Sequence, residues 1–122
     1  MKPEEIKKTL LGGMLNYMNL SAEAHYDQAH LDQCEKYLDE FRLAVAKTAG
    51  NYPQTMAQVE KTVVALNQLN DDCEKSLIET DQREDICAFI EEAIIAAGTD
   101  LDALAASQNC TRHEITDEWR EW

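Results

Sequence analysis

The chain has few of the residues that interrupt regular structure. It contains two prolines and four glycines in 122 residues, no Asn-Gly or Asp-Gly pair, and no stretch in which apolar and polar residues alternate one by one. β-Hairpins depend on such turns and on such alternation. A β-protein is therefore excluded, and the scarcity of both breakers is typical of a helical protein with few tight turns.

Long apolar runs and the motifs of common enzymes are also missing. The longest uniformly apolar run, residues 93–97, is too short to span a membrane, and Glu4 and Glu5 stand where the apolar part of a secretory signal would begin. The chain has no GxSxG, HExxH, phosphate-binding glycine loop or dinucleotide fingerprint. We expect a soluble, cytoplasmic protein that contacts no membrane, has no cofactor and is not an enzyme.

Basic residues are scarce, above all in the second half of the chain. The formal net charge is −13; residues 1–69 carry nine acids and seven bases, whereas residues 70–122 carry fifteen acids and four bases. A field of this sign repels phosphate backbones and attracts cationic partners. Nucleic-acid binding is therefore disfavoured, although acidity also serves plain solubility.

The four cysteines form no Cys-x-x-Cys pair, so the usual signature of zinc ribbons and thioredoxin-like redox sites is absent. Three of them fall on apolar stripes, where we expect reduced, buried thiols that pack as small hydrophobic groups. The alternative, a bridge between Cys73 and Cys87, requires an oxidising compartment.

The middle of the chain carries a seven-residue apolar rhythm. Spacings of three and four place residues on one side of an α-helix. Two stripes have this spacing: Leu31, Cys34, Leu38, Phe41, Val45 and Thr48, and then Met56, Val59, Val63, Leu66, Asn70, Cys73 and Leu77. The short break at residues 49–53 allows the second helix to fold back on the first, which predicts an antiparallel hairpin.

Capping and breaking residues set the expected ends of the helices. Four main helices are expected at about residues 3–18, 21–49, 53–77 and 81–97. Ser21 and capping boxes that begin at Thr55 and Asp81 supply N-caps, and Gly50 and Gly98 end the second and fourth helices. Two questions stay open: whether the third helix opens at residue 53 or with its box, and whether the glycines at 12 and 13 break the first helix or pack against another backbone.

The end of the chain predicts smaller elements. A short helix is expected over residues 100–107, and a third capping box at Thr111 precedes Ile115, Trp119 and Trp122, spaced i, i+4 and i+7. The whole sequence thus predicts one all-α domain over residues 1–122. Its expected architecture is an up-down bundle of four main helices plus one or two short C-terminal helices.

One group of residues in the expected second helix has the chemistry of metal ligands. Asp27, His30 and Cys34 lie at i, i+3 and i+7, and a carboxylate, an imidazole and a thiolate can all bind zinc or iron. The first, third and fourth helices supply no histidine to complete such a site. We therefore favour capping or surface roles for Asp27 and His30 and a core position for Cys34, and we predict no metal.

Asn70 occupies a position on the apolar stripe of the third helix, where an unpaired polar group would cost stability. We expect it to fix the register of the hairpin. The alternative is that the helix turns outward at residues 70–72.

The predicted partner-binding surface combines acids with aromatics. Residues 70–92 contain nine acids and two bases without the residue order of a calcium loop, which indicates either a docking face or a solvated outer face. Two tryptophans lie in the last four residues, where they either pin the terminus or anchor an interface. The residues predicted to bind a partner are Asp71, Asp72, Glu74, Glu84, Asp85, Trp119 and Trp122.

These observations favour a small acidic module that binds another, basic protein. In size, helicity and charge the chain is similar to bacterial immunity proteins, which cover basic clefts such as those of nucleases, although no motif is shared. The first alternative is a self-associating structural or regulatory helical domain, for example a homodimer with no charged partner. The second, less favoured, is a metal-binding sensor or enzyme.

Overall fold

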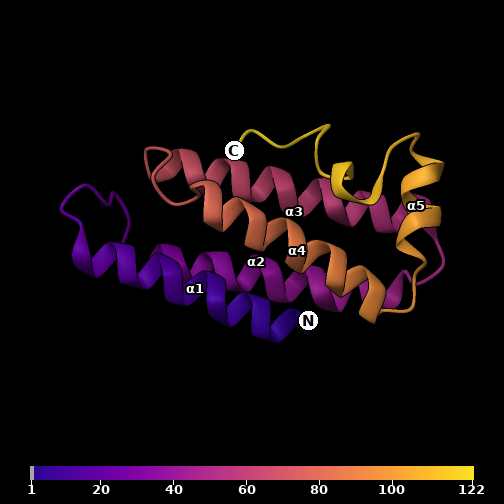
Figure 1. Cartoon of the computed structure of the whole chain (residues 1–122), viewed down its shortest axis with the longest axis horizontal. Helices are drawn as coiled ribbons and strands as arrows, with labels where there is room; N and C mark the ends of the chain where they lie inside the picture. The colour runs from indigo at the N-terminus through magenta and orange to yellow at the C-terminus, as the bar shows by residue number, and fades with distance from the viewer. Residues whose placement is uncertain (1) are drawn as a thin grey trace.

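The computed structural model describes residues 2–122 and is all-α in that part of the chain (Figure 1). The helices are α1 (Pro3–Leu20), α2 (Gln28–Lys47), α3 (Tyr52–Asp72), α4 (Thr80–Ala96) and α5 (Leu101–Ser107), and a 3₁₀ turn, η1 (Arg112–Glu114), precedes the C-terminal tail. The predicted bundle of four main helices is therefore confirmed.

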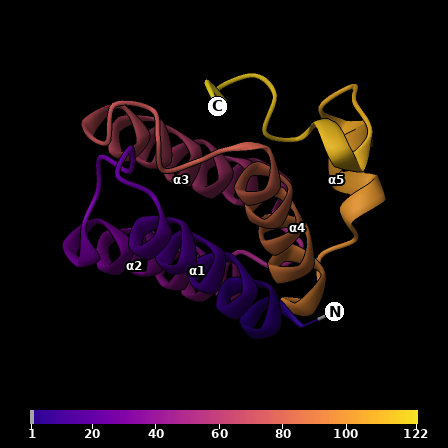
Figure 2. The same cartoon turned by 60° about the vertical axis from the view of Figure 1, so that its left-hand side comes forward.

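Helix α4 lies between the other main helices and the C-terminal elements. It packs against α1 and α2 on one side and against α5 and η1 on the other, while α3 packs mainly on α2 (Figures 1 and 2). This position explains the broad apolar face of α4, whose buried residues are Ile86, Phe89, Ile90, Ala93 and Ile94.

The apolar residues of the two stripes are all buried. In α2 they range from fully buried to 4% exposed, and in the second stripe the most exposed is Met56 at 7%. Gly50, with φ of 79°, makes the turn between α2 and α3, a backbone conformation that glycine adopts without steric cost. The hairpin predicted from the seven-residue rhythm is confirmed.

Helix α1 runs without a break through Gly12 and Gly13. A Cβ added at Gly12 would meet nothing within 4 Å, and one added at Gly13 would meet only the side chain of Gln82, at 3.6 Å. Neither expected alternative holds, because the helix does not break and no backbone packs closely against it. The packing of α1 on α4 and α2 outweighs the low helix propensity of two glycines.

Helix α2 begins seven residues later than the predicted cap at Ser21. Asp27 is the N-cap: its Oδ1 accepts a bond from the Ala29 amide at 3.0 Å, while its own amide donates to Nδ1 of His30 at 3.1 Å. The preceding loop is drawn onto α1 because the hydroxyl of the buried Tyr26 donates to the Met14 carbonyl at 2.9 Å. This tertiary contact selects the second of two available caps.

Helices α3 and α4 also differ from prediction at their ends. Asn51 caps α3 through a bond from the Gln54 amide at 3.1 Å, so the predicted box at Thr55 is wrong. The hydroxyl of Thr55 is buried and donates to the Thr48 carbonyl at 3.1 Å. Glu79 caps α4, with its amide donating to Oε1 of Gln82 at 3.1 Å, so the box at Asp81 is placed two residues too late.

The C-terminal part follows the prediction more closely. Gly98, with φ of 96°, ends α4, and Oδ1 of Asp100 accepts from the Ala103 amide at 3.0 Å to open α5. The capping box at Thr111 is present. It opens only η1, and the chain beyond residue 119 has no regular secondary structure.

In the part of the chain from residue 2 to residue 122, none of the helices combines the length and the hydropathy that crossing a membrane requires.

Candidate functional site

The turn between α3 and α4 presents acids to solvent. Asp71 and Asp72 are the last residues of α3 and Glu74 follows in the turn; all three are exposed. Asn70 holds this turn in place, because its Oδ1 accepts from the Ile78 amide at 3.0 Å and its carbonyl accepts from the Lys75 amide at 2.7 Å. The expected role of Asn70 in hairpin register is therefore corrected: its side chain fixes the turn that ends α3.

The backbone of this turn is unusual. Glu74 and Lys75 both have positive φ, 54° and 60°, in the left-handed region that residues other than glycine seldom enter. Each such residue costs free energy, and such strain is concentrated at functional segments of proteins. The buried bonds of Asn70 hold the two residues in this conformation, so the acids around them have a defined position.

Three acids of this surface form no ion pair with a lysine or arginine. Among residues 2–122, no Lys or Arg nitrogen lies within 4 Å of a carboxylate oxygen of Asp71, Asp72 or Glu84. Asp72 accepts only a neutral bond from Gln68 at 2.9 Å, and Glu74 lies 2.8 Å from Nδ1 of the exposed His25. The carboxylates of Asp71, Asp72 and Glu84 are therefore not neutralised by ion pairs, and acids outnumber the one lysine in the turn at the end of α3.

The two predicted acids of α4 face different ways. Glu84 precedes Cys87 by three residues and therefore shares its side of the helix, and the sulfur of Cys87 lies 3.8 Å from Oγ1 of Thr116, at the start of the tail. Asp85 is seven residues before Glu92, which borders α1, so it lies toward α1. Burial, together with nearby acids, raises the pKa of Asp85. Glu84 thus lies on the side of α4 that faces the tail, and Asp85 lies on the side that faces α1.

The C-terminal tail lies along α3. The buried side chain of Asn67 donates from Nδ2 to the carbonyl of Trp119 at 2.8 Å and accepts at Oδ1 from the amide of Glu121 at 3.1 Å. Figures 1 and 2 both show the end of the chain above the C-terminal half of α3. Asn67 is one helical turn before Asp71, so the structure brings the tail close to the acids at the end of α3.

The two tryptophans are only partly exposed. The side chains of Trp119 and Trp122 pack against the hydrophobic core, and the indole Nε1 of Trp122 is buried with no hydrogen-bond partner in the described part of the chain. The tail is thus pinned to the bundle. The role of Trp119 and Trp122 in partner binding stays a prediction.

The sequence analysis did not identify Asn67, which directly follows Leu66 of the apolar stripe. The available signal was its position three residues before Asn70, which places a second asparagine near the buried side of the helix. A buried amide needs hydrogen-bond partners. Its partners are backbone groups of a segment more than 50 residues away, and sequence spacing does not reveal them.

The residues with metal-ligand chemistry are not arranged as a metal site. Among residues 2–122, no group of three or more His, Cys, Asp or Glu side chains is placed to hold a metal ion. Asp27 and His30 cap α2, as expected, and Cys34 is fully buried in the core. Burial raises the pKa of the Cys34 thiol to about 12, which makes it a packing residue.

All four cysteines are free, so no bridge joins Cys73 to Cys87. Burial raises the pKa of the Cys73 thiol to about 11, and burial likewise raises the pKa of Cys87. Neither pKa is lowered in the way that the pKa of a reactive cysteine is.

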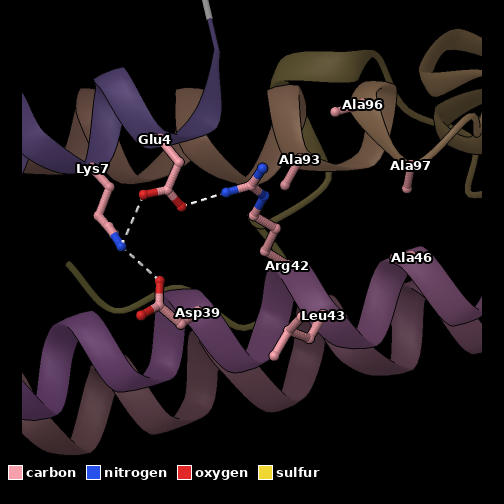
Figure 3. A pocket seen from close by; sticks show the side chains of 9 residues that line it. All are labelled: Glu4, Lys7, Asp39, Arg42, Leu43, Ala46, Ala93, Ala96 and Ala97. Carbon is pink, nitrogen blue, oxygen red and sulfur yellow. Dashed lines mark hydrogen bonds and ion pairs between the residues drawn. The ribbon is translucent and has the colours of Figure 1, made fainter.

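A groove of about 540 Å³ lies between α1, α2 and α4 (Figure 3). Its apolar lining residues are Leu43 and Ala46 of α2 together with Ala93, Ala96 and Ala97 at the end of α4, and Leu43 has 67% of its surface exposed.

Ion pairs occupy the charged edge of this groove. Nζ of Lys7 lies 2.8 Å from Asp39 and 3.1 Å from Glu4, and Glu4 also pairs with Arg42 (Figure 3). The same nitrogen lies 3.3 Å from Glu35. The bond from Lys7, and then that from Arg42, lowers the pKa of Glu4. Because these charges satisfy one another between α1 and α2, we assign the cluster to stability. The Glu4–Lys7 spacing was visible in the sequence, but the pairing across helices was not.

Comparison of the chain with known protein families, with curated proteins and with solved structures finds no match.

Proposed function

We propose that this chain is a small acidic module that binds a basic protein, in the manner of an inhibitor or immunity-type protein that covers a cationic cleft. The surface that carries the binding is the acidic end of the bundle, formed by Asp71, Asp72, Glu74 and Glu84. The observation that carries the proposal is that these acids are exposed and largely unpaired, whereas the acids of α1 and α2 around Lys7 are paired.

Three features of the surface support this function. Asn70 holds the strained turn at Glu74 and Lys75, so the charges are preorganised and less freedom is lost on binding. Uncompensated charge of one sign speeds the encounter with a partner of the opposite sign. The exposed parts of Trp119 and Trp122 extend the surface with aromatic area of the kind that interfaces favour.

The test uses two variants of equal net charge. The docking variant carries Asp71→Asn, Asp72→Asn, Glu74→Gln and Glu84→Gln, and the matched control carries Glu5→Gln, Glu23→Gln, Asp32→Asn and Glu60→Gln. The four control residues are exposed, and in the described part of the chain none forms an ion pair with a lysine or arginine. Asp32 accepts a bond from the glutamine four residues earlier, as Asp72 does.

Immobilised wild type, docking variant and control are exposed to lysate of the source cells, and the retained proteins are identified and then purified for direct binding. The proposal predicts a basic protein retained by wild type and control and lost with the docking variant. Equal retention by all three would contradict it. Light scattering of the free chain covers the self-associating alternative: a stable dimer unaffected by the docking variant favours that alternative.

A further inference from the structure

The loop between α1 and α2 meets the acidic end of the bundle through His25. Nδ1 of His25 lies 2.8 Å from a carboxylate oxygen of Glu74, and the backbone amide of the same residue donates to the hydroxyl of Ser76 at 3.1 Å. That hydroxyl donates in turn to the Cys73 carbonyl at 2.7 Å. Figures 1 and 2 both show this loop at the same end of the bundle as the turn that joins α3 to α4. The loop is therefore joined to this turn by one side-chain contact and one backbone contact.

Both partners of the side-chain contact are held by anchored backbone. Tyr26, the residue after His25, is buried and bonds the Met14 carbonyl at 2.9 Å. Glu74 lies in the strained turn that the buried side chain of Asn70 fixes. The histidine side chain is still 52% exposed. The imidazole is thus placed beside Glu74 in the free chain and stays open to water and to protons.

The charge of His25 changes the charge that a partner meets at this turn. An ionised carboxylate only accepts hydrogen bonds, so the imidazole donates to Glu74 from Nδ1. Histidine is the side chain that changes its charge between pH 5 and 8. Three acids and one lysine give residues 71–75 a formal charge of −2, which a charged histidine reduces to −1. Protonation therefore halves the net negative charge here and pairs Glu74 with a cation of the chain itself.

The other titratable groups around this contact belong mostly to classes that do not titrate near neutral pH. They are acids, a lysine and a tyrosine: Glu23 and Asp27 beside the histidine, Asp71, Asp72 and Lys75 beside Glu74, Glu79 at the start of α4, and Tyr17 near the end of α1. Burial raises the pKa of the Cys73 thiol to about 11 and that of Tyr26 to about 12, so both stay neutral. His30, which caps α2, is the other histidine at this end. It is left in place in every variant below, so its contribution cancels in the comparison.

We propose that His25 makes the acidic end of the bundle sensitive to pH, because a charged His25 competes with the basic partner for Glu74. Docking is then strongest where histidine is neutral, and it weakens as the pH falls through the range in which histidine takes up a proton. By linkage, a bound basic partner disfavours the charged form of His25, so docking in that range releases a proton. The proposal rests on the proposed function, since it describes the regulation of the same surface.

The test measures binding of a labelled octalysine peptide by fluorescence anisotropy, at one low salt concentration and at about pH 8 and about pH 5.5. With its ends acetylated and amidated, this peptide has the same charge at both pH values, because lysine titrates near about pH 10.4. His25→Gln keeps a hydrogen-bond donor beside Glu74 but cannot take up the charge. His113→Gln is the matched control, because His113 is also exposed and also lies beside one acid, Glu91 at 3.0 Å, but belongs to η1, next to α5.

At about pH 8 wild type and both variants should bind octalysine equally, with unchanged helicity in circular dichroism. At about pH 5.5 wild type and His113→Gln should lose about threefold more affinity than His25→Gln, the size expected for one exposed charge pair. The proposal is overturned if His25→Gln weakens as much as wild type, or if His113→Gln is as insensitive to pH as His25→Gln. Failure of the proposed function gives a different result: the docking variant would then bind octalysine as well as wild type does at about pH 8.

Discussion

Replacement of Asn70 by alanine tests whether this polar residue on the apolar stripe of α3 closes the turn after α3 or sets the register between α2 and α3. In the structure its side chain accepts a hydrogen bond from the Ile78 amide at 3.0 Å. Both residues are buried, with 5% of Asn70 and 6% of Ile78 exposed. Asn70→Ala leaves that amide without a partner, which costs about 1–3 kcal/mol. For a domain of this length, each kcal/mol corresponds to about 3–5 °C in the melting temperature. We therefore expect urea unfolding to show that the free energy of unfolding of Asn70→Ala is about 2 kcal/mol lower than that of wild type, with an unchanged m-value.

Amide hydrogen exchange shows where the stability is lost. Loss of the bond from the Ile78 amide to Asn70 should make the amides of Lys75 and Ile78 exchange faster through local opening of the turn. The amides of α2 and α3 where these helices pack together should exchange faster only to the extent that global stability falls. Gln68→Ala is the control; it removes only an exposed bond to Asp72 and should change stability by less than about 0.5 kcal/mol. The reasoning fails if Asn70→Ala unfolds like wild type, or if protection is lost along the α2–α3 contact and kept in the turn.

Further predictions follow from three other places in the bundle. Lys7→Met should destabilise the chain by about 1 kcal/mol near neutral pH, a discounted figure because the partner carboxylates are half exposed. The lowered pKa of Glu4 means that its stabilisation is present above pH 4.5 and is lost as the pH falls through the folded pKa, so thermal melts of variant and wild type should converge in acid; a constant gap would contradict this. Gly12→Ala, in a helix interior with nothing within 4 Å of the added Cβ, should stabilise by about 0.5–1 kcal/mol, and a lower melting temperature would refute that. Cys34 and Cys73 are fully buried and should react with a thiol reagent only after unfolding, so prompt labelling of all four thiols would show that the core is wrongly assigned.

The sequence was sufficient for the fold because its main signals are local and repeated. The seven-residue rhythm of α2 and α3, the broad apolar face of α4 and the glycine at residue 98 each act through spacing along one helix. The structure buries the stripes and ends α4 as expected. Helix starts were less predictable, because Ser21 and Asp27 are both acceptable caps and the contact of Tyr26 with α1 selects the second.

The candidate site could be predicted only in part. The excess of acids in residues 70–92 can be counted in the sequence. Because charged side chains are rarely buried, their exposure at the end of α3 could be expected. The contacts that organise the site are not local: Asn67 bonds the backbone of the tail, and Asn70 bonds a residue eight positions later in a turn that two left-handed residues create. Seven-residue spacing suggested a role in helix pairing for Asn70, whereas the structure uses it to close a turn.

The most direct test of the proposed function is the rate at which this chain associates with the protein that the immobilised wild type retains, measured by stopped flow as the salt concentration rises. Raising salt from about 0.1 M to about 1 M shortens the Debye length from about 10 Å to about 3 Å, which screens exposed charges. Wild type and the Glu5/Glu23/Asp32/Glu60 control should associate fast at low salt and slow steeply, and the Asp71/Asp72/Glu74/Glu84 variant should be slow with a shallow dependence. Equal rates for all three proteins at every salt concentration would contradict the claim that the acidic end of the bundle carries recognition.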